Sequence, residues 1–301
     1  MDRRPYLAIA VAIVCVSFSA IFIRWSNSPP LLIGAYRLTF ASLILVPFAL
    51  RGRPRPFWHL PQADLARLGG IGLILASHFA LWITSLKSTA EGVTVASSVV
   101  LVTAHPILVA AVSHFLFRER VTTSMAAGIT MGLVGVAVIS VGALGLSTAT
   151  FAADSLSLLA GVAAGFYFLA GRQLRGRISL LSYVLPVYAA AAAAMWALVF
   201  AAGTSPIPPA PVGQEFALFL AMAVIPQLGG HTLYNWSLRF VPAPIVSLSL
   251  VGEVIGSSLL AWWLLGEIPG PAVAVGGSLI LLGLVVTAWG GGRVPRAAAT
   301  V

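Results

Sequence analysis

The chain contains ten long apolar segments, and its second half repeats the first at an offset of about 148 residues. Leu116–Glu119 aligns with Leu264–Glu267, and Gly128 aligns with Gly276 at the same offset. If each copy holds five membrane-spanning helices, an odd number, the second copy must lie upside down relative to the first. Inverted repeats of this kind let a membrane protein build two alternating gates around one central site. We therefore predict two transmembrane repeats, residues 1–147 and residues 148–301.

The apolar segments predict helices rather than strands. Each is continuously apolar over about 20 residues, the length at which an α-helix crosses a bilayer, whereas barrel strands alternate over about 10 residues. Only 8% of the residues are charged and 59% are hydrophobic, a composition that could not cover the surface of a soluble domain. The sequence thus predicts an all-α membrane protein with ten transmembrane helices in two inverted five-helix repeats. The expected helices span residues 6–24, 30–50, 68–86, 92–117, 122–142, 155–171, 179–202, 214–237, 242–265 and 269–290.

The basic residues are distributed asymmetrically along this layout. Seventeen basic against eight acidic residues give a net charge of +9, which in a soluble chain would suggest nucleic acid. Here fourteen arginines fall on one side of the ten-helix layout, and only Arg24 and Lys87 flank the other side. This bias places both termini in the cytoplasm. We expect a multi-pass protein of the cell inner membrane, surrounded by lipid and without a nucleic-acid partner.

Two ionisable residues, Arg37 and Glu253, are predicted at membrane depth. A charge there costs roughly 2.5–3.5 kcal/mol on insertion scales and so requires a reason. Arg37 can pair with another buried group or extend to the outer headgroups. Glu253 aligns with His105 of the other repeat and can either carry a coupling proton or serve helix packing. Protons are therefore a candidate coupling ion.

Polar and aromatic side chains gather on single faces of several predicted helices. His78 and Trp82 are four residues apart in one helix, and the repeat mate of that helix carries His231, Tyr234 and Asn235. A polar helix face inside lipid must look into protein or into water, which favours a lined cavity. The predicted substrate-binding residues are His78, Trp82, Ser98, His231, Tyr234, Asn235, Phe18, Phe22 and Tyr167, with Arg37 and Glu253 as intramembrane charges.

Other parts of the sequence predict scaffold and argue against catalysis. The helices near 122–142 and 269–290 carry glycines and almost no polar side chains, which favours close packing between helices or an oligomer surface. We expect a monomer or a weak dimer. The aspartates Asp2, Asp64 and Asp154 are all expected to flank helices. Hydrolase, metalloprotease and Walker motifs are absent from the sequence, so we predict no enzyme activity, no cofactor and no metal.

Over nearly its whole length the chain resembles the EamA-type ten-helix exporters of the drug/metabolite transporter superfamily. The residues that carry the resemblance are Arg37, the stretch 80–85, Pro106, Glu253 and the stretch 265–267. The run 252–254, with aromatic residues in the middle of the helices, is similar to the aromatic amino acid exporters of the YddG type. Phe117 and Arg118 depart from the Leu-Gly-Glu pattern of the family, and Val254 replaces a common proline. The resemblance implies export by alternating access through a central cavity lined by both repeats.

The expected function is therefore secondary transport that exports small metabolites, aromatic or other hydrophobic amino acids in particular. A pump for cationic drugs would need cavity carboxylates, and only Glu253 qualifies. A nucleotide-sugar or phosphorylated-metabolite carrier would need a basic cluster, and only Arg37 qualifies. A membrane assembly factor without transport is the third alternative, although it has no obvious use for inverted repeats.

The charge bias generates a test of topology. Reporter fusions at the C-terminus and near residue 147 should label opposite compartments, with the C-terminal reporter in the cytoplasm. Labelling of both reporters on the same side of the membrane would contradict the inverted-repeat layout.

Overall fold

The computed structural model describes residues 4–51, 60–88, 90, 93–105, 122–175, 178–237, 240 and 243–291. All regular elements within these ranges are helical. They are α1 (Arg4–Trp25), α2 (Pro30–Arg51), α3 (Gln62–Leu86), α4 (Val95–Val102), α6 (Thr123–Leu146), α7 (Thr148–Arg175), α8 (Leu180–Ala201), α9 (Val212–Met222), η1 (Ala223–Thr232), α10 (Leu233–Ser237), α11 (Ala243–Leu265) and α12 (Pro271–Gly291).

The helices are long and apolar enough to make this a multi-pass membrane protein. Seven candidate spans occur in the described ranges, and two shorter apolar stretches, Gly252–Leu265 and Pro271–Thr287, add to them. The predicted helical class is therefore confirmed. The count of ten also depends on the predicted helix 92–117, of which Pro106 onward lies outside the described residues, as do Arg118 and Glu119.

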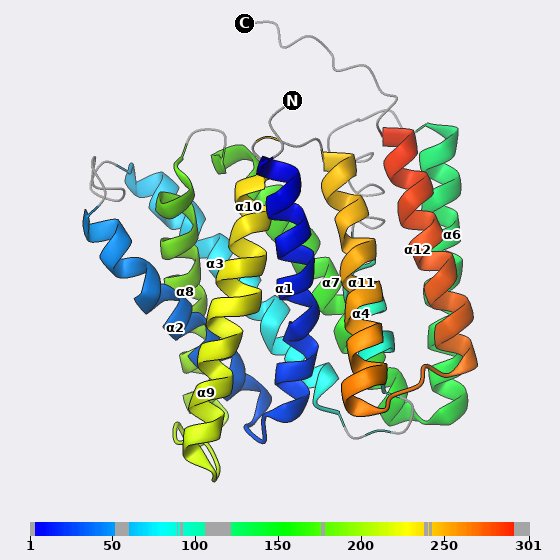
Figure 1. Ribbon diagram of the computed structural model, residues 1–301, viewed down its shortest axis with the longest axis horizontal. Helices are drawn as coiled ribbons and strands as arrows, with labels where there is room; N and C mark the ends of the chain where they lie inside the picture. Colours follow the sequence, from blue (N-terminus) through cyan, green and yellow to red (C-terminus); the bar gives the residue numbers. More distant parts are fainter. Residues whose placement is uncertain are drawn as a thin grey trace, which may run out of the picture.

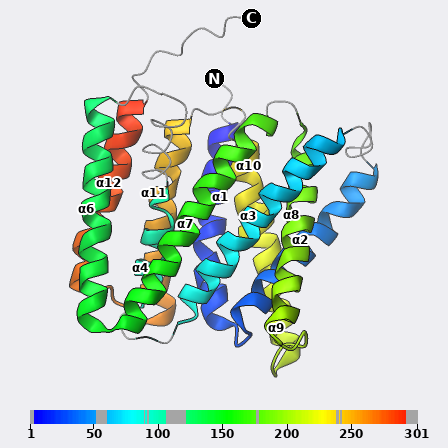
Figure 2. The same cartoon turned by 180° about the vertical axis from the view of Figure 1, so that it is seen from behind.

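The helices lie side by side in a bundle with two well-defined ends (Figure 1). We call the end where α1 begins and α12 ends the terminal end, and the opposite end the distal end. The first helices of the two repeats, α1 and α7, run in opposite directions between these ends (Figures 1 and 2).

The helix contacts recur when the two repeats are exchanged. α2 packs against α8 and α6 packs against α12, and each pair joins corresponding helices of the two halves. α3 packs along α7, and correspondingly α1 packs along η1 and α10. The interior of the bundle is therefore built jointly by both repeats rather than by either one alone.

Glycines bring α6 and α12 into direct backbone contact. A Cβ on Gly135 would lie 2.5 Å from the carbonyl oxygen of Gly276, and one on Gly276 would lie 2.6 Å from that of Gly135. Gly128 and Gly283 repeat this reciprocal arrangement, also with 2.6 Å on each side. Small residues at such a crossing give van der Waals contact that lipid cannot replace. The small residues thus mark a helix–helix contact within the chain, one of the two roles expected from the sequence.

The predicted start of one helix at residue 155 is wrong. α7 begins at Thr148, because the Ser147 hydroxyl accepts a hydrogen bond from the backbone N–H of Thr150 at 3.0 Å and caps the first turn. Asp154 consequently lies inside α7 instead of flanking it, and only 4% of its surface is exposed. The hydroxyl-bearing residues before residue 155 thus belong to the cap and the first turns of α7.

The predicted single helix 214–237 is divided by a π-helical segment, η1. Pro226 lies inside it and supplies no backbone donor. Gly230 lies against α1, where a Cβ would meet Val16 Cγ1 at 2.4 Å. The widened turn therefore coincides with the closest approach between this segment and α1. π-helical segments are rare and occur frequently at functional sites.

The glycine contact between α6 and α12 predicts a stability difference between two glycine substitutions. Gly135→Ala should lower the stability by about 1–3 kcal/mol, because the new methyl group collides with backbone that cannot rotate away. Gly70→Ala in α3, where a Cβ meets nothing within 4 Å, should be neutral or stabilising by up to about 1 kcal/mol. Thermal unfolding of both variants in one detergent measures this difference. Equal stability of the two variants would contradict the described packing.

Candidate functional site

A cavity of about 50 Å³ lies in the interior between helices of both repeats. It has room for about four water molecules if each occupies about 10–15 Å³ of such space. Its lining residues come from α1, α3, α4, α7, η1, α10 and α11, with two in the turn after α4. They are Ser19, Leu75, His78, Trp82, Val102, Thr103, His105, Ala164, Tyr167, His231, Tyr234 and Glu253.

One wall of the cavity is the face of α3 that carries His78 and Trp82. Their rings are nearly parallel, with centroids 6.1 Å apart, as the four-residue spacing allows. His78 Nδ1 donates to the carbonyl oxygen of Ala160 on α7 at 2.9 Å, which fixes the ring orientation. The buried indole N–H of Trp82 has no hydrogen-bond partner among the described residues. This wall therefore offers an aromatic surface and an available donor.

A second part of the lining combines η1, α10 and α7. His231 and Tyr234 line it, together with Tyr167. Asn235, which is not a lining residue, donates from Nδ2 to the Tyr167 hydroxyl at 3.0 Å and so positions that ring. The polar face predicted for this segment is thus divided between residues that line the cavity and a residue that supports them.

Arg37 lies behind the cavity wall, fully buried. Its Nε donates to Gln227 Oε1 at 2.9 Å and its Nη1 donates to Ser19 Oγ at 2.8 Å. The guanidinium carbon lies 4.3 Å from the centroid of the Phe79 ring. These contacts hold α1, α2, α3 and η1 together, so Arg37 does not extend to the headgroups. Its Nη2 has no hydrogen-bond partner within the described part of the chain.

Glu253 reaches the cavity from α11. Among the described residues it forms no hydrogen bond and no ion pair within 4.0 Å, with Arg37 or with any other group. Arg37 influences it only at longer range. A basic and an acidic side chain therefore lie inside the bundle without direct contact between them.

The remaining predicted site residues lie near the cavity without lining it. Ser98 is fully buried, and its hydroxyl is 2.7 Å from that of Ser157. Phe18 and Phe22 stack on each other along α1, with ring centroids 5.7 Å apart. Ser19 and Thr103 line the cavity but were not predicted, because isolated small hydroxyls inside apolar helices give no distinct sequence signal.

The ring of His105, which lines the cavity, takes the place of a backbone hydrogen-bond donor at the end of α4. α4 ends at Val102, so the carbonyl of this residue has no donor from its own helix. His105 Nδ1 lies 3.0 Å from that oxygen and donates to it. Gly161 of α7 packs against the same carbonyl, where a Cβ would lie only 2.7 Å away. The polar atom at this helix interruption is therefore satisfied within the protein, as a membrane interior requires.

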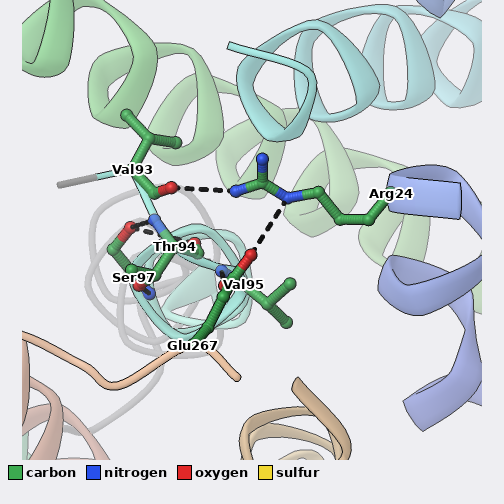
Figure 3. Close-up of polar contacts among 6 residues, drawn as sticks. All are labelled: Arg24, Val93, Thr94, Val95, Ser97 and Glu267. Atoms are coloured by element: carbon green, nitrogen blue, oxygen red, sulfur yellow. Dashed lines mark hydrogen bonds and ion pairs between the residues drawn. The ribbon is translucent and has the colours of Figure 1, made fainter. Parts of the chain in front are cut away.

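At the distal end, a group of polar contacts joins three parts of the chain (Figure 3). Arg24 at the end of α1 donates from Nη2 to the Val93 carbonyl oxygen at 2.8 Å, and its Nε lies 3.5 Å from Glu267 Oε1. Glu267 Oε2 accepts from the backbone N–H of Val95, the first residue of α4, at 2.7 Å. A carboxylate at a helix N-terminus is favoured by both the free donor and the helix dipole. We call Arg24, Glu267 and the start of α4 the distal clasp.

Further contacts hold the same end closed. Glu215 of α9 accepts hydrogen bonds from Ser26 and Ser28 hydroxyls at 2.5 and 2.7 Å. Lys87, just beyond α3, donates to the Ser26 carbonyl oxygen at 2.5 Å. Partial burial lowers the pKa of the Lys87 ammonium, and nearby Glu215 acts in the opposite direction. The loop between α1 and α2 is thus tied to α3 and α9.

A bundle of membrane-spanning helices around a polar and aromatic cavity is an arrangement found in small-molecule membrane transporters. Residues 3–141 and 151–289 each match the model of the EamA-like transporter family. The chain therefore belongs to this family, and the two matches correspond to its two halves.

A solved structure described as "Crystal structure of protein" has the same fold, with a TM-score of 0.67. It is 22% identical in sequence, and the match covers 98% of this chain and 100% of the other. No curated protein matches the chain.

The distal clasp generates a prediction about access to the cavity. Glu267→Gln removes the ion pair, a loss of about 1 kcal/mol for a partly exposed pair at a helix end. A cysteine at Thr103, in a Cys15→Ala background, should then react about three- to tenfold faster with a membrane-impermeant thiol reagent added at the distal side. Arg67→Gln, which breaks the Asp64–Arg67 pair near the terminal end, is the matched control. Equal labelling rates in the two variants would show that the clasp does not limit access.

Proposed function

We propose that this transporter exports small aromatic or other hydrophobic amino acids from the cytoplasm across the inner membrane. It would do so by alternating access between two inverted five-helix repeats, with both termini cytoplasmic. The observation that carries the substrate class is the separation of two opposite charges at an aromatic cavity. Glu253 lines the cavity without a partner among the described residues, and Arg37 lies behind Ser19 on another side.

A zwitterion matches this arrangement of charge. Its ammonium group can pair with the Glu253 carboxylate, which restores the compensation that a buried charge requires. Its carboxylate can accept from the Ser19 hydroxyl, because the Ser19 oxygen already accepts from Arg37 and its own proton is available to donate. The positive charge of Arg37 strengthens that donor without entering the cavity itself.

The aromatic lining supports an aromatic or hydrophobic side chain on the substrate. Trp82, Tyr167 and Tyr234 present ring surfaces, on which apolar and aromatic groups stack favourably. The cavity volume of about 50 Å³ is small, so the site must expand to accept such a molecule. A form closed at the distal clasp with a contracted cavity is consistent with one state of an alternating-access cycle.

The second candidate function is efflux of lipophilic amines, and the unpaired Glu253 carboxylate favours it as well. An amine without a carboxylate would use Glu253 and the aromatic rings but would gain nothing from Ser19 and Arg37. A carrier of phosphorylated metabolites is disfavoured, because Arg37 is fully buried and among the lining residues none is basic apart from histidine.

Transport assays with matched substrates test the proposed function. In proteoliposomes, radiolabelled tryptophan should show counterflow and should be competed by phenylalanine but only weakly by tryptamine or indolepropionate. Glu253→Gln should lower the apparent tryptophan affinity at least about tenfold, as expected for loss of a charged hydrogen bond of about 1.5–3 kcal/mol. Asp64→Asn, an acid-to-amide change near the terminal end, should leave the affinity unchanged. Stronger competition by tryptamine than by phenylalanine would identify an amine exporter instead.

A further inference from the structure

A second buried carboxyl, Asp154, lies outside the cavity in the second turn of α7. Only 4% of its surface is exposed, and its Oδ1 has no hydrogen-bond partner among the described residues. The Ser97 hydroxyl of α4 lies close enough to influence this carboxyl, but it donates its proton to the Thr94 carbonyl oxygen at 3.1 Å. A buried carboxylate is strongly disfavoured unless a positive charge or several donors compensate it. Asp154 has neither within the described part of the chain.

The charged and titratable groups around α7 do not compensate Asp154. On α3, His78 bonds to the Ala160 carbonyl, two turns away from Asp154 along α7. At the start of α4, Glu267 and Arg24 are engaged with each other and with backbone. Lys87, just beyond α3, donates to the Ser26 carbonyl. Across the described residues, no side chain of α6 or α8 forms an ion pair with it.

Three buried hydroxyls form a cluster one helical turn beyond Asp154. Ser157 lies one turn further along the same face of α7, and its hydroxyl is 2.7 Å from that of Ser98 on α4 and 2.8 Å from that of Ser85 on α3. All three serines are fully buried. Carboxylate and hydroxyl oxygens are the ligands that hard cations prefer, and hydroxyls can both donate and accept a proton.

We propose that Asp154, together with Ser97, Ser98 and Ser157, binds the monovalent cation, a proton or Na⁺, that drives transport. The cation neutralises the buried carboxylate, and the neighbouring hydroxyls either coordinate it or relay it. The role of this cation site in transport rests on the proposed function. The existence of the site does not depend on that function.

The position of the site explains how binding of the cation would affect the distal clasp. Ser97 is the third residue of α4, and the first residue of the same helix, Val95, donates its N–H to Glu267 in the distal clasp. A negative charge on Asp154 and the carboxylate of Glu267 both interact with the positive N-terminal end of α4. When Asp154 is neutralised, Glu267 is the only one of the two carboxylates that still interacts with the N-terminal end of α4. Cation binding thus changes the free-energy difference between the closed and the open form of the distal clasp.

Infrared difference spectra of purified protein in lipid test the site without any substrate. Wild type and Asp154→Asn are compared across pH in choline buffer and then with added Na⁺. For a proton site, the spectrum should contain a protonated-carboxyl band that disappears as pH rises and is missing in Asp154→Asn. For a sodium site, a carboxylate band missing in Asp154→Asn should shift with Na⁺ but not with choline. A band of Asp154 that responds to neither would overturn the proposal.

Two further variants guard against misfolding and unspecific effects. Ser157→Ala keeps the carboxyl and should shift the midpoint of the Asp154 band about tenfold in cation concentration, the effect of removing one charge-assisted interaction with the bound cation. Asp64→Asn, at the other end of the bundle, should leave the Asp154 band unchanged. An unchanged midpoint in Ser157→Ala would remove the hydroxyls from the proposed site.

Transport separates the cation site from the proposed function. Asp154→Asn should retain tryptophan counterflow while it loses accumulation driven by a proton or Na⁺ gradient. Absence of counterflow in wild type would refute the proposed substrate class, yet the infrared result would still decide whether Asp154 binds a cation. Gradient-driven accumulation that persists in Asp154→Asn would refute the coupling role.

Discussion

The burial of Arg37 is the constraint on which the centre of the bundle depends. Within a bilayer no water is available to solvate a guanidinium, so the protein itself must supply acceptors and a polarisable surface. Gln227, Ser19 and the ring of Phe79 provide them from η1, α1 and α3. Each of these helices must therefore approach α2 at one level, and the cavity forms beside that meeting point. The π-helical segment carries Gln227 to Arg37 and, one turn later, His231 to the cavity.

The structure deals with its ionisable side chains in two different ways. At the distal end, Arg24 and Glu267 compensate each other and the start of α4. Inside the bundle, Arg37, Glu253 and Asp154 are not paired with one another within the described residues. Unpaired charge is costly to maintain and is a feature of sites that bind something from outside the chain. The clasp connects helices at the distal end, whereas Glu253 in the cavity has no ion-pair partner among the described residues.

The sequence could predict the helical class and much of the cavity, because both follow from local patterns. Long apolar runs can only be membrane helices, and the spacing of His78 and Trp82 determines that they share a face. Ser98 and Asn235 show the limit of this reasoning, since their hydroxyl and amide are satisfied by Ser157 and Tyr167 on a helix far away in sequence. The π-helical turn of η1 could not be predicted either, because the apolar pattern continues through it. Within this segment Gly230 packs against α1, a tertiary contact that the local pattern does not reveal.

The π-helix also has a mechanical consequence. Each of its turns is closed by a bond over five residues instead of four, so η1 contains extra chain within the span. If the wide turns tightened to α-helix while Gln227 stayed bound to Arg37, every residue beyond them would rotate about the helix axis by about 100° per residue absorbed. His231 and Tyr234 would then turn away from the cavity, and neighbouring residues of the same segment would line it instead. A change between π-helical and α-helical turns in η1 would thus change which side chains face the cavity. It would not require any pair of helices to separate.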